Sequence, residues 1–194
     1  MLRRAMRVGG LVGLCLAGGI AASGRRGREL DEGAFRAINR GRGPVPDRLA
    51  TGITELGSIW ASVGAAAALA ALGRRSAAAR GLGAASAAWL AGQGLKRLFL
   101  RPRPYQADPD GVRLLAHPPR ATSWPSSHPA VVLAFVTAAG RELRLPPGAR
   151  STLTGLAVAV GVSRTYVGVH YPSDVIGGLL LGRAVAEALS GDGG

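Results

Sequence analysis

Cysteine and aromatic residues are scarce in this chain. Cys15 is the only cysteine among 194 residues, so no disulfide can form within the chain. Aromatic residues make up only 5% of the sequence, although apolar residues make up 47% and another 30 residues are glycine. A soluble core so rich in alanine and glycine would bury little apolar area, whereas membrane helices use small residues to pack closely. The composition therefore favours membrane helices.

Acidic residues are also few, with 11 against 24 basic ones, which gives a formal net charge of +13. Such an excess is common in proteins that bind nucleic acids. Here, however, the arginines fall mostly between apolar runs, with no interleaved aromatic residues and no known binding motif. Anionic lipid headgroups explain the charge better, so we expect membrane lipids and no nucleic acid as partners.

The first polar cluster contains Lys96, the only lysine in the chain, and Arg103 seven residues later. Proline fixes its own φ angle and favours an extended residue before it, so Pro102 and Pro104 hold Arg101 and Arg103 on a stiff segment. A guanidinium held in this way can bind two phosphate oxygens at once. The alternative is a basic collar that flanks a membrane span.

The second cluster, Ser126-Ser127-His128-Pro129, opens an apolar run at residues 130–139. Proline is favoured in the first turn of a helix, and serine is favoured just before it. A helix start offers free backbone N–H groups and partial positive charge, which attract an anion. Taken alone, the cluster favours an ordinary capped helix with His128 as a loop residue at the membrane surface.

The third cluster places Arg164 six residues before His170, which is followed by Asp174. Pro172 is well placed to begin a helix, so Asp174 falls in its first turn. A carboxylate there can accept a hydrogen bond from one imidazole nitrogen and leave the other free to attack. Arg164 follows an apolar run, where an arginine is costly unless it binds something. An interfacial histidine beside a helix-start charge is the alternative.

The three clusters, in this order and with this spacing, resemble the signature of the type-2 phosphatidic acid phosphatase superfamily, over about residues 50–190. Its members include lipid phosphatases, bacterial acid phosphatases and vanadium haloperoxidases. The resemblance implies three catalytic residues, His170, His128 and Asp174. It implies phosphate binding by Lys96, Arg103, Ser126, Ser127 and Arg164. The family has glycine where this chain has Ser127, a departure that bears on substrate choice.

The resemblance also implies a mechanism that needs no cofactor. His170 attacks phosphorus and forms a phosphohistidine, while Asp174 orients it. His128 protonates the leaving oxygen and then takes a proton from the hydrolytic water. Lysine and arginines supply the positive charge, and no His, Cys, Asp and Glu cluster has metal-ligand spacing, so we expect no metal.

The fold expected from the apolar runs is all-α, a six-span transmembrane helix bundle. The predicted spans are Val8–Ser23, Gly57–Leu72, Ala77–Leu95, Pro129–Leu145, Thr152–Val169 and Val175–Leu189. Several are short for a bilayer core, which requires about 20 residues. We divide the chain into residues 1–56 (first span and an interfacial segment, with Arg28–Ile38 as an amphipathic helix), the core domain 57–190, and the tail 191–194.

Arginines in the short connectors predict the orientation of the bundle. Those before the first predicted span, between the second and third, and between the fourth and fifth belong on the cytoplasmic side. The catalytic connectors, residues 96–128 and 163–174, then share the outer face of a bacterial inner membrane. Seven arginines in residues 24–56 conflict with this arrangement. Residues 1–23 also fit a secretory signal, although we favour an uncleaved span.

The expected function is a membrane phosphatase that acts on a lipid phosphate, such as a polyprenyl phosphate or diphosphate or phosphatidate. One alternative is a vanadate-dependent haloperoxidase, which would use the same residues to hold vanadate and would oxidise halide. Another is a non-catalytic membrane protein that keeps a lipid-phosphate site and shows no turnover. The sequence does not identify the lipid, its chain length or the oligomeric state.

Overall fold

Helices form all the regular structure in residues 1–41 and 43–190, the part of the chain that the computed structural model describes. They are α1 (Leu2–Ser23), α2 (Arg25–Ile38), α3 (Pro44–Glu55), α4 (Ile59–Ala71), α5 (Arg75–Leu98), α6 (Pro104–Ala107), α7 (Ser127–Glu142), α8 (Pro147–Tyr166) and α9 (Pro172–Ala188). The expected all-α fold is confirmed. The predicted tail, residues 191–194, lies outside the described residues.

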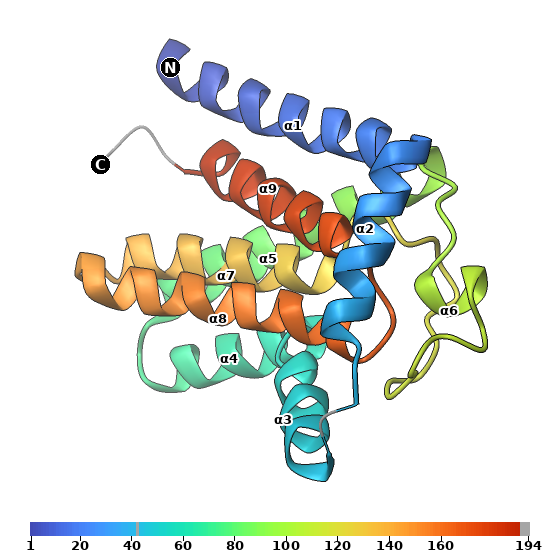
Figure 1. Cartoon of the computed structure of the whole chain (residues 1–194). Coiled ribbons are helices and arrows are strands. Elements are labelled where there is room, and N and C mark those ends of the chain that lie inside the picture. The colour runs from blue at the N-terminus through green and yellow to red at the C-terminus, as the bar shows by residue number, and fades with distance from the viewer. Residues whose placement is uncertain (42, 191–194) are drawn as a thin grey trace.

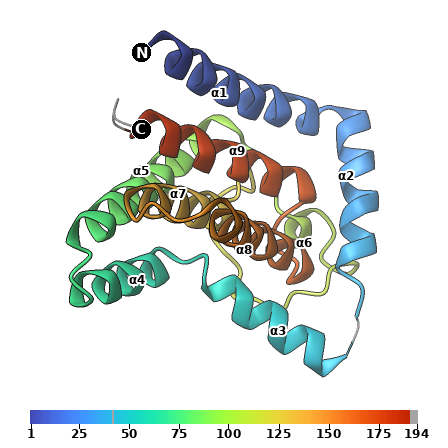
Figure 2. The same cartoon turned by 90° about the vertical axis from the view of Figure 1, so that its left-hand side faces the viewer.

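Helix α7 forms the centre of the bundle. It packs against α4, α5, α8 and α9, while α1 lies along α9 on the far side from α7 (Figure 1, Figure 2). Every residue from 129 to 135 in α7 is buried, because neighbouring helices cover this half on all sides. In contrast, α2 crosses the ends of α8 and α9 instead of running along them (Figure 1).

Small residues let these helices approach closely. Ala84, Ala85 and Ala88 of α5 are fully buried, and α5 packs closely against α7. In α9, a Cβ atom at Gly178 or Gly182 would collide with backbone carbonyl oxygens of the segment that begins α7. The contact between α7 and α9 therefore needs glycine, which is the use of small residues that the composition predicts.

Each apolar run predicted from the sequence coincides with one helix, namely α1, α4, α5, α7, α8 and α9, and Arg28–Ile38 forms most of α2. Two helices were not predicted, α3 and α6. Both begin at a proline, Pro44 and Pro104. Proline is common at the first position of a helix, so these prolines mark helix starts within segments that resembled loops.

Hydropathy supports fewer membrane spans than six. Among the described helices, α1 alone is long and apolar enough to cross a membrane by itself. Helices α3 and α4 would pass together as one span, although the chain bends by 66° between them. Helices α7 and α9 contain only 16 and 17 residues, and α5 ends in basic residues.

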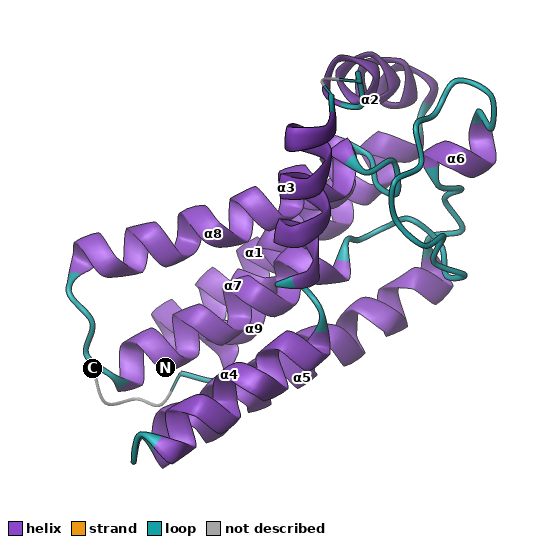
Figure 3. Cartoon of the chain, turned by 90° about the horizontal axis from the view of Figure 1, so that it is seen from below, coloured by secondary structure: helices purple, strands orange, loops and turns teal. Residues whose placement is uncertain are grey.

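The three polar clusters meet at one end of the bundle (Figure 3). Helices α5 and α8 end where α7 and α9 begin, so the connectors 99–126 and 167–171 lie next to each other there. The backbone joins them directly, since the amide of Leu115 donates to the carbonyl of Val167 at 3.0 Å. We call this the catalytic end of the bundle.

Candidate active site

A cavity of about 320 Å³ opens at the catalytic end, between α4, α5, α7 and α8. Six of the eight side chains expected at the site line it: Lys96, Arg103, Ser127, His128, Arg164 and His170. Of the other two, Asp174 lies behind His170, and Ser126 is fully buried at the residue before α7. The fold therefore gathers the three sequence clusters around one space.

His170 and Asp174 form a buried pair. The Nδ1 atom of His170 lies 3.3 Å from Oδ2 of Asp174, whose carboxylate is completely buried. The same oxygen accepts from the amide of Tyr171 at 2.9 Å and from the Ser123 hydroxyl. Because a carboxylate can only accept, the network assigns the imidazole proton to Nδ1 and leaves a lone pair on Nε2.

Arg103 lies at that lone pair. Its Nη1 lies 3.0 Å from Nε2 of His170 and also donates to the carbonyl of Val169 at 2.8 Å. Burial, followed by the nearby Arg103 and Lys96, lowers the pKa of His170 well below its usual value. The imidazole is therefore neutral at physiological pH, the form in which it can act as a nucleophile.

The cations around the cavity are held by neutral oxygen atoms. Lys96 donates to the carbonyls of Thr122, Ser123 and Pro125 at 3.0, 3.3 and 2.6 Å. Arg103 donates to the carbonyl of Ala121 at 2.7 Å, and Arg164 donates to the Thr54 hydroxyl at 2.9 Å. In the described part of the chain, none of the three cations pairs with a carboxylate, and no group of three His, Cys, Asp or Glu could hold a metal ion. Their positive charge thus remains available to an anion.

Two buried polar groups that line the cavity also lack hydrogen-bond partners among the described residues. Nε of Arg164 and the Ser127 hydroxyl are buried and have no hydrogen-bond partner among the described residues. Each such group costs about 1–3 kcal/mol when it is left unsatisfied. A bound phosphate would provide acceptors for both, so the site is arranged for an oxyanion.

The serines at the start of α7 differ from expectation in detail. Ser126 precedes α7 as expected, yet its hydroxyl is buried without a partner and does not cap the helix. Ser127 lines the cavity, and its hydroxyl lies against Gly92 of α5, where a Cβ would be only 3.1 Å away. Gly92 therefore supplies the room that the extra side chain of Ser127 requires.

His128 is half-buried and lies beside Gly57, in the turn between α3 and α4. A Cβ on Gly57 would lie 2.6 Å from Cβ of His128 and 2.6 Å from a methyl group of Val160. Gly57 thus fixes the position of the His128 side chain from behind. Sequence reasoning did not identify Gly57, because its role depends on a contact between segments 71 residues apart.

Two further polar residues at the site, Thr54 and Asp31, were not assigned to it from the sequence. Thr54 of α3 binds Arg164, and Asp31 of α2 binds Arg101 at 2.5 Å. Arg101 was expected to share a phosphate-binding segment with Arg103, but it contacts Asp174 at 2.8 Å and does not line the cavity. No local pattern reveals these pairs, since their members lie at least 70 residues apart.

Together, the all-α bundle and the buried histidine–carboxylate pair facing three cations agree with the arrangement that the resemblance implies. The comparison with protein families agrees. The chain belongs to the PAP2 superfamily, whose model matches residues 60–190. The resemblance inferred from the three clusters is therefore confirmed.

Two relatives share part of the sequence. The chain is 34% identical over 100 residues to decaprenylphosphoryl-5-phosphoribose phosphatase of Mycobacterium tuberculosis, which covers 52% of each protein. It is 41% identical over 85 residues to YbjG of Escherichia coli (strain K12), provisionally named an undecaprenyl-diphosphatase, over 44% of this chain and 41% of that protein. The chain spans about half the length of the curated relatives it matches.

Two solved structures share the fold over most of the chain. A transmembrane PAP2-type phosphatidylglycerolphosphate phosphatase from Bacillus subtilis aligns with a TM-score of 0.73 and 24% identity, over 92% of both chains. LpxE of Aquifex aeolicus aligns with a TM-score of 0.68 and 29% identity, over 78% of this chain and 89% of that one. The helix arrangement is therefore that of PAP2 proteins.

Lys96 is expected to set the alkaline limit of activity. It lies just past the predicted span Ala77–Leu95, and burial, with Arg103 nearby, lowers its pKa to about 7. As pH rises through this value the lysine loses its charge, so kcat/KM for a phosphate substrate should fall. Lys96→Arg keeps the charge at every pH tested, so its alkaline limb should move upward by more than one pH unit. Identical alkaline limbs in pH–rate profiles of the two proteins would contradict this assignment.

Gly57→Ala is expected to displace His128 and reduce kcat. The new Cβ would meet Cβ of His128, which cannot swing aside as the tip of a long side chain could. Small misplacements of catalytic groups can reduce rates by about 100-fold. Gly64→Ala in α4 is the matched control, because no atom lies within 4 Å of its added methyl group. Equal phosphate-release rates for the two variants would show that Gly57 does not position His128.

Proposed function

We propose that this chain is an integral-membrane phosphatase that hydrolyses the phosphate of a lipid, with His170 as its nucleophile. The observation that carries the proposal is the placement of His170, beside Asp174, in a cavity whose three cations pair with no carboxylate among the described residues. Membership of the PAP2 superfamily and the phosphatase names of both relatives support the same reaction class.

In the first step, Nε2 of His170 attacks phosphorus as the bond to the leaving oxygen breaks. Arg103 gives up its contact with Nε2 and turns to the phosphoryl oxygens, where it joins Lys96 and Arg164 in stabilising the developing charge. His128 donates a proton to the leaving oxygen. Asp174 holds Nδ1–H and stabilises the positive charge of the phosphohistidine.

In the second step, water attacks the phosphohistidine. His128 accepts a proton from this water, the P–N bond breaks, and neutral His170 and inorganic phosphate result. Burial, followed by Arg164 and Arg103, lowers the pKa of His128 to about 3. The negative charge of a bound phosphate opposes this effect, so substrate binding itself favours the acid form that the first step requires.

The cavity walls favour a lipid substrate. Ile59 and Trp60 of α4 and Trp89 of α5 line the cavity beside its cationic floor. Trp60 is 75% exposed and Trp89 is 40% exposed, so an apolar surface continues from the cavity to the outside of the bundle. An apolar chain can lie along this surface while its phosphate reaches His170. The polyprenyl-linked substrates in the names of both relatives favour a polyprenyl phosphate or diphosphate.

The proposed topology has six spans, carried by α1, α4, α5, α7, α8 and α9, which leave Lys96 and His128 just outside the membrane-spanning parts. The catalytic end lies on the outer face of a bacterial inner membrane. Arginines at the other end of the bundle support this orientation, because Arg74 and Arg144 lie in the connectors there, and Arg75 and Arg141 lie in the adjoining helix ends. The overlap with a transmembrane PAP2 phosphatase over 92% of both chains supports the multi-pass arrangement.

A phosphate-release assay in detergent with EDTA tests the function. It compares polyprenyl phosphate, polyprenyl diphosphate, phosphatidate and phosphatidylglycerol phosphate, with inorganic phosphate as the product measured. We expect turnover of a polyprenyl substrate and a loss of about 1,000-fold or more in His170→Ala, as for other enzymes that lose a nucleophile. His117→Ala is the control, because His117 is an exposed histidine in the connector before α7. Near-normal activity of His170→Ala would overturn the mechanism, and no turnover of any lipid phosphate would overturn the function.

A further inference from the structure

Asp174 has a second oxygen whose partner lies outside the histidine pair. Oδ1 accepts from Nη1 of Arg101 at 2.8 Å, and Nη2 of Arg101 donates to Oδ2 of Asp31 at 2.5 Å. All three side chains are at least 94% buried. Asp31 belongs to α2, ahead of residues 60–190, the segment that matches the family.

Arg101 thus bridges the carboxylates of Asp31 and Asp174, and further contacts hold this bridge in place. Asp31 also accepts from the amide of Ser173 at 2.9 Å and from the Ser173 hydroxyl, which in turn accepts from Arg101 at 2.7 Å. The guanidinium of Arg101 lies over the ring of Tyr171, 4.3 Å from its centre. These contacts tie α2 to the first turn of α9, where Asp174 lies.

The charges of Asp31, Arg101 and Asp174 explain what the loss of Arg101 or of Asp31 would do. One buried cation lies between two buried carboxylates, so removal of Arg101 would leave two like charges with no cation between them. Removal of the Asp31 charge would leave Arg101 with Asp174 as its only anionic partner and would draw the Asp174 carboxylate away from the imidazole. Either change disturbs the hydrogen bond that orients His170.

We propose that Asp31 and Arg101 are positioning residues that hold the Asp174 carboxylate in place for His170, so that α2 forms part of the catalytic machinery. The proposal rests on the proposed function, since it needs a reaction at His170. Neither residue lines the cavity, so neither contacts the substrate.

Separate measurement of kcat and KM for a polyprenyl phosphate tests this role. We expect Asp31→Asn to lower kcat by about 10- to 100-fold with KM within about twofold, the scale on which small misplacements act. Arg101→Lys should lower kcat in the same range. The single ammonium group of lysine cannot bind both carboxylates as the two terminal nitrogens of the guanidinium do. Glu29→Gln makes the matching change at an exposed position of α2 and should leave kcat unchanged.

A double mutant separates positioning from general stability. In an Asp174→Asn background, Asp31→Asn should lower the residual rate no further, since it acts through the carboxylate already lost. Wild-type kcat in both Asp31→Asn and Arg101→Lys, beside an inactive His170→Ala, would overturn the bridge and leave the proposed function intact. Additive losses, or loss of the folded protein in both single variants, would show a structural role and would also overturn it. An active His170→Ala would instead refute the proposed function.

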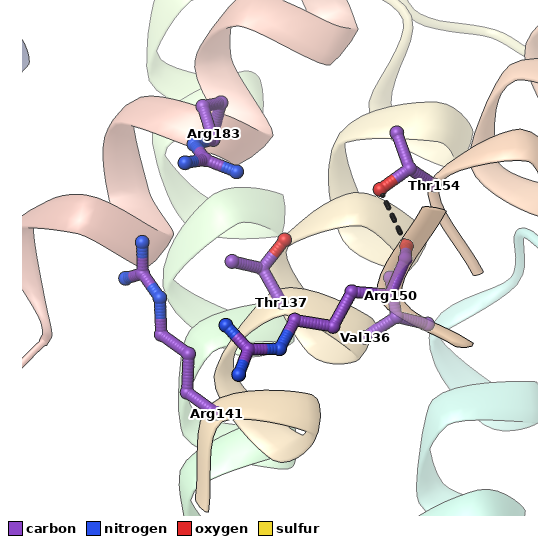
Figure 4. Close-up of a pocket in the computed structure, with 6 residues that line it drawn as sticks. All are labelled: Val136, Thr137, Arg141, Arg150, Thr154 and Arg183. Carbon is purple, nitrogen blue, oxygen red and sulfur yellow. Dashed lines mark hydrogen bonds between the residues drawn. The ribbon is translucent and has the colours of Figure 1, made fainter. Parts of the chain in front are cut away.

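A second, independent feature lies at the opposite end of the bundle. Arg141 of α7, Arg150 of α8 and Arg183 of α9 surround a pocket of about 90 Å³, together with the hydroxyls of Thr137 and Thr154 (Figure 4). The three arginines differ in their ion pairs. Glu187 binds Arg141 at 2.5 Å and Arg183 at 2.7 Å, whereas Nε of Arg150 donates only to the carbonyl of Leu145 in the described part of the chain.

We also propose that this pocket binds a phosphate-bearing anion. Three guanidinium groups converge on it and one carboxylate offsets them, so an anion would relieve their repulsion and accept hydrogen bonds from their forks. The source of the phosphate is either the headgroup of an anionic lipid or free phosphate. Basic pockets between membrane helices suit anionic headgroups. This proposal does not depend on the activity of His170.

Thermal unfolding in lipid nanodiscs tests the pocket. Replacing phosphatidylcholine with phosphatidylglycerol should raise the wild-type midpoint by about 2–4 °C. Arg150→Gln should lose this rise, because it removes the arginine of this pocket that has no carboxylate partner among the described residues. Arg75→Gln, an exposed arginine at the start of α5, should keep it. The same rise from inorganic phosphate in phosphatidylcholine would identify free phosphate as the ligand. A rise that Arg150→Gln retains, or no rise from either source, would overturn the proposal.

Discussion

The buried carboxylate of Asp174 accepts hydrogen bonds from donors in three separate segments of the chain. Arg101 and Ser123 come from the two ends of the long connector before α7, and His170 and the Tyr171 amide come from the short connector before α9. A fully buried carboxylate is stable only when such donors surround it. The same contacts that stabilise the buried Asp174 carboxylate therefore also fold both connectors over the catalytic end. Both the fold of the catalytic end and its chemistry therefore depend on the Asp174 carboxylate.

The partners of the basic residues separate two uses of positive charge. Arg101 lies between two carboxylates, so its charge is compensated within the protein and serves the structure. Lys96 and Arg103 are held chiefly by backbone carbonyls, and Arg164 by a hydroxyl. Neutral oxygens fix the geometry of a cation without cancelling its charge. A phosphate that enters the cavity therefore meets cations that are already in position and whose charge no carboxylate among the described residues neutralises. Transition-state stabilisation requires such preorganised charge.

The sequence predicted the site because each of two groups of site residues lies within a few consecutive positions of the chain. His170 and Asp174 lie four residues apart around Pro172, which begins α9 as predicted, and Ser127 and His128 lie in the first turn of α7. The helix positions were also readable from the apolar runs. The contacts of Asp31 with Arg101 and of Thr54 with Arg164 were not, since they join helices before the family core to segments 70 and 110 residues later. Nothing in the local sequence of α2 distinguishes Asp31 from its exposed neighbour Glu29.

Serine in place of the family glycine at position 127 shows how this chain keeps the site open. The Ser127 hydroxyl needs space next to α5, and α5 provides it with Gly92 at the point of contact. On the other side, Gly178 and Gly182 let the backbone of α9 lie against the start of α7. The N-terminal amides of α7 are thus placed between two helices that carry no side chain where they meet it. A larger residue on either helix would push α7 away from His170, so the small residues that make this sequence resemble a membrane protein also bring the second cluster within reach of the third.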